Sequence, residues 1–139
     1  MTEADVTRIE SELNVRLPAD YRGLLLDPPF APLDEGRVYW LYDDPDTVIA
    51  ATRFPLNEFY DGKGWIPSYL AIGETAMGDQ YLIDLDRSPS PVFCLSHETH
   101  EVEPDYPDLP AFVAGWNEEL ATARRHRRPI RRGRWWKFW

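Results

Sequence analysis

The sequence predicts a single domain that combines helices with an antiparallel β-meander. The chain has 139 residues, a length that suits one domain. Hydrophobic residues make up 43% of it and aromatic residues 14%, enough for a folded core. Apolar residues recur at helical spacing near both ends, and short strand-like runs lie between them. Thirteen prolines argue against long unbroken helices.

The helical segments carry recognisable start and stop signals. Thr2 is placed to cap a first helix that ends at Asn14. Pro18 suits the first position of a second short helix. The acidic turn at 43–46 can cap a third helix over 47–53. A last helix opens at Asp108 or Leu109 and is expected to continue to Pro129, with one apolar face formed by Phe112, Val113, Trp116 and Leu120.

The strand candidates are short runs rich in β-branched and aromatic residues, at 38–42, 69–72, 80–85 and 91–97. The short links between the last three favour antiparallel pairing. Residues 54–68 and the acidic stretch 98–108 read as loops. We expect three indole rings to be buried in the core, those of Trp40, Trp65 and Trp116.

The charge of the chain is divided sharply between its two parts. All 24 acidic residues and seven of the 15 basic ones lie in residues 1–120, which gives that part a formal charge of −17. Residues 121–139 carry eight basic residues and no acid. An acidic body repels nucleic acid and attracts basic proteins.

The expected location is the reduced cytoplasm. Cys94 is the only cysteine, so an internal disulfide and a cysteine-based zinc site are excluded. The acidic start does not have the pattern of a secretory signal, and no apolar run approaches the length of a membrane span.

Five motifs in order resemble the SUKH superfamily, which includes the Smi/Knr-type domain. They are Leu17-Pro18-x-Asp20-Tyr21-Arg22-x-Leu24-Leu25 after the first helix, Trp65-Ile66-Pro67 with Leu70-Ala71-Ile72-Gly73, Gly78-Asp79-x-Tyr81-x-Ile83-Asp84-Leu85, Pro91-Val92-Phe93 with His97, and Phe112-x-x-x-Trp116. The resemblance covers about residues 3 to 120. The Asp27-Pro28-Pro29 turn and the basic tail depart from the family pattern.

This resemblance implies an α+β fold, with an antiparallel or mixed sheet partly wrapped by helices, and no cofactor. It divides the chain into a SUKH-like domain over 1–123 and a tail over 124–139. Many bacterial members of the superfamily resemble immunity proteins, which neutralise a cognate toxin. A toxin with a basic surface would complement the acidic body. Eukaryotic relatives resemble regulators of cell-wall synthesis, so a regulatory scaffold is the alternative function.

Three candidate chemical sites have a simpler structural explanation. His97 and His100 are three residues apart at a strand exit, which does not match the helical His-Glu-x-x-His zinc pattern. Asp84, with Asp79 and Asp86 nearby, could serve acid–base chemistry, but no nucleophile accompanies it. Cys94 lies in an apolar strand, where cysteines mostly pack. We therefore predict neither catalysis nor a metal site.

Two acidic clusters are the candidate partner-binding residues, with solubility as the competing explanation. One is Asp43, Asp44 and Asp46; the other is Glu98, Glu101, Glu103, Asp105 and Asp108. The tail at 124–139 combines eight basic residues with Trp135, Trp136, Phe138 and Trp139. Its alternatives are docking on the acidic body or on a second copy, contact with an anionic membrane, nucleic-acid binding, and disorder. The acidic body opposes nucleic-acid binding.

Overall fold

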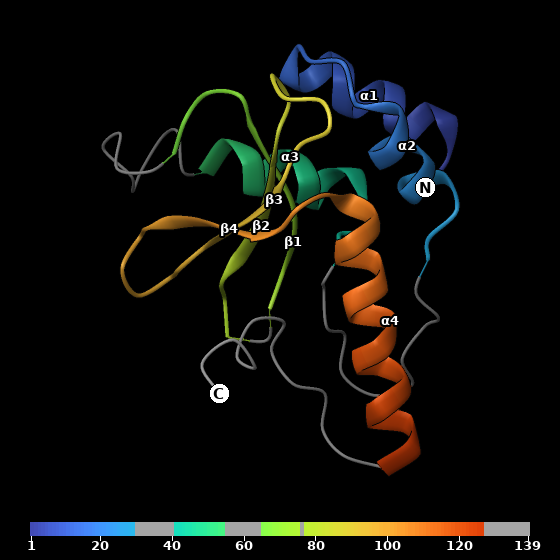
Figure 1. Ribbon diagram of the computed structural model, residues 1–139. Coiled ribbons are helices and arrows are strands. Elements are labelled where there is room, and N and C mark those ends of the chain that lie inside the picture. The colour runs from blue at the N-terminus through green and yellow to red at the C-terminus, as the bar shows by residue number, and fades with distance from the viewer. Residues whose placement is uncertain (30–40, 55–64, 76, 127–139) are drawn as a thin grey trace.

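The protein combines four helices with a four-stranded antiparallel sheet, which confirms the α+β prediction. A computed structural model describes residues 1–29, 41–54, 65–75 and 77–126 (Figure 1). The helices are α1 (Glu3–Leu13), α2 (Ala19–Leu26), α3 (Pro45–Phe54) and α4 (Leu109–His126). The strands are β1 (Tyr69–Glu74), β2 (Gln80–Asp84), β3 (Val92–Leu95) and β4 (Val102–Tyr106).

The sheet has the strand order β1-β2-β3-β4, so each strand pairs with its neighbours in sequence. This is the meander that the short links predict. Gly73 does not end β1 as expected, because the strand passes through a bulge between Ala71 and Gly73 and continues to Glu74. A second irregularity lies between Val92 and Phe93, where β3 pairs with β4.

The stretch 98–108, predicted as a loop, contains the edge strand β4. Its carboxylates and Pro104 conceal the strand in the sequence, because both are depleted in sheets except at edges. Of the predicted strand at 38–42, residues 38–40 lie outside the described residues. Leu41 and Tyr42 are not in a strand, although the Tyr42 N–H donates to the Ile72 carbonyl oxygen at 2.8 Å.

Local sequence signals set most helix ends. Thr2 and Asp5 form a reciprocal capping box on α1, and Asn14 ends that helix in the left-handed conformation. Pro18 is not the first helical residue, as predicted, but the cap before it, with an extended ψ of 149°. Helix α3 begins at Pro45, with Asp44 before it, and so exceeds the predicted 47–53 by two residues at its start and one at its end.

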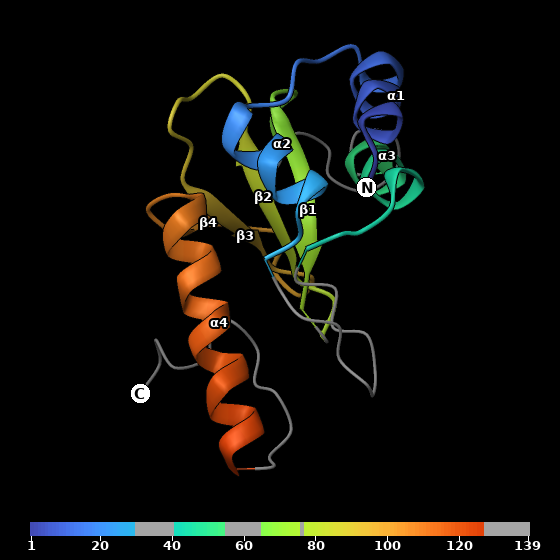
Figure 2. The same cartoon turned by 90° about the vertical axis from the view of Figure 1, so that its right-hand side faces the viewer.

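Aromatic rings pack on both faces of the sheet. On one face the Tyr81 ring meets the Phe112 and Trp116 rings of α4, with centroids 5.0 and 6.2 Å apart. On the other face Tyr69 and Phe93 lie 5.3 Å apart. Helices α2 and α4 lie on the same side of the sheet (Figure 2). Trp65 and Trp116 are buried as predicted, and Trp40 lies outside the described residues.

Helix α3 covers the outer edge of β1. The Ala71 N–H at that edge donates to the buried Thr52 hydroxyl of α3 at 3.0 Å. Because an unpaired buried amide is costly, this bond allows a helix to close the sheet edge. Within the described residues, none of the helices combines the length and the apolar character needed to cross a bilayer.

Candidate interaction surface

The first acidic cluster lies at the start of α3, and most of its carboxylates serve the fold. Asp44 accepts hydrogen bonds from the Thr47 N–H at 2.9 Å and from the Thr47 hydroxyl at 2.5 Å, and so caps the helix. Asp46 forms an ion pair with Arg8 of α1. Asp43 is exposed.

The second cluster centres on the hairpin that joins β3 to β4. Glu98 and Glu101 lie in the connection, and Glu103 lies on β4; all three are exposed. The Glu98 side chain is 75% exposed and lies 3.7 Å from Nε2 of His97. We call Glu98, Glu101 and Glu103 the acidic hairpin. It is the part of the second cluster that reaches solvent.

The other two members of that cluster are less exposed, Asp105 buried and Asp108 partly buried. Asp105 is only 7% exposed, so its carboxylate lies in the protein interior and not on the hairpin surface. Asp108 accepts a hydrogen bond from the Ala111 N–H at 2.9 Å and caps α4. Neither residue therefore contributes to the exposed acidic surface that the sequence pattern suggests.

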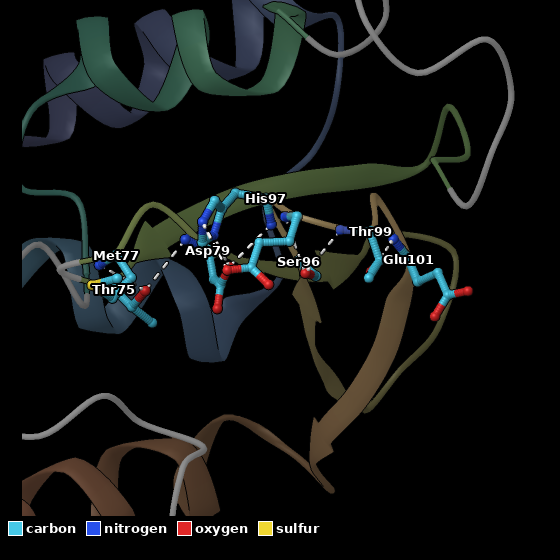
Figure 3. A network of polar contacts seen from close by, with 8 residues as sticks. Thr75, Met77, Asp79, Ser96, His97, Thr99 and Glu101 are labelled. Atoms are coloured by element: carbon cyan, nitrogen blue, oxygen red, sulfur yellow. Dashed lines mark hydrogen bonds and ion pairs between the residues drawn. The ribbon is translucent and has the colours of Figure 1, made fainter.

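A network of hydrogen bonds holds the acidic hairpin (Figure 3). The Ser96 hydroxyl accepts from the N–H groups of Glu98 and Thr99, and the Ser96 N–H donates to the Glu101 carbonyl oxygen at 3.0 Å. His100 has a positive φ of 61°, and its N–H donates to the Ser96 carbonyl oxygen. The connection therefore has a defined conformation before any partner arrives.

Asp79 anchors this hairpin to the turn between β1 and β2. Its Oδ1 atom accepts from the His97 N–H at 3.0 Å and lies 2.6 Å from His97 Nδ1. The turn is itself closed by Thr75, whose hydroxyl accepts from the Asp79 N–H at 3.2 Å. The contact joins residues 18 positions apart, so no local pattern in the sequence announces it. Only the Gly78-Asp79 turn signal is visible there.

The two acidic clusters lie at opposite edges of the sheet and do not form one surface. Tyr42, next to Asp43, bonds to β1, whereas Glu103 lies on β4. Strands β2 and β3 separate these edges, a distance of roughly 14 Å at the usual strand spacing. A single small contact would therefore engage one cluster or the other.

Among the candidate chemical residues, Asp79 and His97 are in contact, but Asp84 does not converge with them. Asp84 lies at the end of β2, and His97 follows the end of β3. Because the two strands are antiparallel, these residues lie at opposite ends of the sheet. The Asp84 carboxylate accepts from the Asp86 N–H at 3.0 Å, a backbone role. Among the described residues, no three metal-ligating side chains gather as a metal site requires. Cys94 is buried.

The buried tyrosines stay protonated at neutral pH. Burial raises the pKa of the Tyr21, Tyr42 and Tyr81 hydroxyls far above the ordinary value of 10.0. Burial also raises the pKa of Glu74, at the end of β1. These shifts follow from packing and do not mark a cleft with an activated base.

The fold and the site together define a small α+β domain with a structured, exposed acidic hairpin. The sequence profile of the SMI1 / KNR4 family (SUKH-1) matches residues 1–115, which is most of the chain. The chain therefore belongs to the SMI1 / KNR4 family. Its members are commonly immunity proteins of polymorphic toxin systems, and their domains are generally non-catalytic. No curated protein matches the chain.

Proposed function

We propose that this protein is an immunity protein that binds and neutralises a cognate toxin through the acidic hairpin. Membership of the SUKH-1 family is the observation that carries the proposal. The partner is a protein with a surface rich in lysine and arginine, opposite in sign to the −17 body. The proposed role is to hold the toxin, without chemistry on it.

The acidic hairpin is favoured over the cluster at α3 because its charges are not committed to helix caps. Asp44 and Asp46 already bond to Thr47 and Arg8, so a partner would have to compete with these contacts. Glu98 and Glu101 are exposed on a connection that the Ser96 bonds hold. A surface that is ordered before binding loses less conformational entropy on association.

Charges at the rim of an interface mainly accelerate encounter and select the partner. The hairpin carboxylates are therefore expected to set the association rate, and less polar neighbours to set the lifetime of the complex. Met77, in the β1–β2 turn beside Asp79, is 45% exposed and is an apolar group of this kind. We propose it as the apolar neighbour of the contact.

The test pairs this protein with the product of the adjacent open reading frame. That product is expressed in a sensitive host, alone and together with the wild-type chain or the variant Glu98→Gln/Glu101→Gln. The control is Glu118→Gln/Glu119→Gln, which removes two charges from α4 instead. We expect the wild-type chain and the control variant to protect the host. When the rate of association with the neighbouring product is measured at low salt, the hairpin variant should associate about tenfold more slowly than the wild-type chain.

A neighbouring product that is harmless, or that is toxic but does not bind this protein, would contradict the proposed function. Equal association rates for the two double variants would contradict the assignment to the hairpin while leaving the immunity role intact.

A further inference from the structure

The end of the chain differs in chemistry from everything before it. Residues 124–139 hold seven arginines, one lysine and no acid. The four aromatic rings of this segment all lie in its last five residues, after the arginines rather than among them. The match to the SUKH-1 family ends at residue 115, before this segment begins.

Helix α4 extends away from the sheet. Phe112, Trp116 and Leu120 are buried and hold the first part of the helix on the domain. The helix continues to His126, and its 18 residues correspond to about 27 Å. In both views the second part of α4 extends past the ends of the strands (Figures 1 and 2). The basic segment thus starts at the far end of a helix that leaves the domain.

We propose that residues 124–139 bind the surface of an anionic lipid bilayer. Stable attachment to a membrane usually takes two signals, such as a basic stretch and an apolar group. The arginines supply the first signal, because each is attracted to anionic headgroups. Trp135, Trp136 and Trp139 supply the second, since indole rings favour the interface between headgroups and acyl chains.

The segregation of the rings favours a bilayer over single-stranded nucleic acid. A nucleic-acid strand is bound by a groove that combines basic and aromatic side chains along its length, so that phosphates and bases are contacted together. Here the four rings and Lys137 occupy the last five positions of the sequence, and all seven arginines precede them. The repulsion between the acidic body and an anionic bilayer is reduced because charges more than about 8 Å apart are largely screened at physiological salt.

Vesicle sedimentation with the full chain tests the proposal. The probes are vesicles of phosphatidylcholine alone and of phosphatidylcholine with phosphatidylglycerol at a ratio of three to one. One variant replaces Trp135, Trp136, Phe138 and Trp139 by alanine and keeps every charge. A second replaces Arg127, Arg128, Arg131 and Arg132 by glutamine and keeps every ring. We expect binding to the anionic vesicles only, and at least a 30-fold weaker partition for each variant.

Absence of binding to the anionic vesicles would overturn the proposal, as would equal binding to both kinds of vesicle. A chain that ignores vesicles but binds a labelled oligonucleotide would also overturn it, in favour of nucleic acid. The variants leave residues 1–123 unchanged, and circular dichroism checks that they fold. Because both tail variants should still protect in the toxin assay, this inference and the proposed function can fail separately.

Discussion

Alanine at Gly115 should destabilise the fold, whereas alanine at Gly23 should stabilise it, although both glycines lie inside helices. A Cβ atom at Gly23 of α2 would have no neighbour within 4 Å. At Gly115 of α4, a Cβ atom would lie 2.9 Å from the Tyr106 Cε1 atom. That ring cannot move aside easily, because Tyr106 is 8% exposed and packs edge-on against Phe112.

Both substitutions gain helix stability, and only Gly115→Ala also carries a cost of overpacking. Replacing glycine by alanine inside a helix stabilises it by about 1 kcal/mol. Gly23→Ala should therefore raise the free energy of unfolding by roughly that amount. Gly115→Ala adds an overpacking cost of about 1–3 kcal/mol where α4 meets Tyr106. The net effect of Gly115→Ala should be a loss of roughly 0–2 kcal/mol in the free energy of unfolding. The free energies of unfolding of the two variants should therefore differ by about 1–3 kcal/mol.

Urea unfolding followed by far-ultraviolet circular dichroism measures both values on the full chain. Thermal unfolding should separate the two midpoints by roughly 2–4 °C for each kcal/mol. If Gly115→Ala is as stable as Gly23→Ala, α4 does not approach β4 as closely as described, and the packing around Tyr106 is misassigned.

Three other changes probe a helix cap, a partly buried acid and the hairpin anchor. Thr2→Ala should cost about 1 kcal/mol in urea unfolding, since it removes half of the α1 capping box; an unchanged midpoint would contradict this. Burial raises the pKa of Glu74, so the charged form of this side chain opposes folding. Glu74→Gln should therefore stabilise the folded protein at pH 7. This gain in stability should vanish as the pH falls below the unfolded pKa of about 4.5, where the carboxyl is neutral in both states. A gain that persists at pH 3 would refute that cause. Asp79→Ala should speed hydrogen exchange at the His97 N–H by at least tenfold and leave the exchange rates of α1 unchanged. Faster exchange throughout the protein would instead indicate a general loss of stability.

The sequence predicts much of this fold because local signals determine so much of it. Thr2 and Asn14 bound α1 as expected, and the runs at 80–85 and 91–97 contain two adjacent strands. Strand β4 is not predicted from the sequence because it has the composition of an edge strand. Glu103 and Pro104 are unfavourable inside a sheet but discourage further pairing at its margin.

The candidate site is less predictable, because exposure and pairing are tertiary properties. Asp105 and Glu103 are two residues apart on one strand, yet the structure buries the first and exposes the second. Asp46 is a surface charge, as the sequence suggests, but its ion pair with Arg8 forms only when the fold brings α1 against α3. The anchor between Asp79 and His97 depends on two turns that meet only when the sheet forms.

Hydrogen exchange of this protein, free and in complex with the product of the adjacent open reading frame, tests the central claim most directly. The proposal predicts a complex with strongly slowed exchange in residues 96–103 and the neighbouring β1–β2 turn, and unchanged exchange in α1. Slowed exchange confined to the face formed by α1 and α3, or no complex at micromolar concentrations, would contradict it.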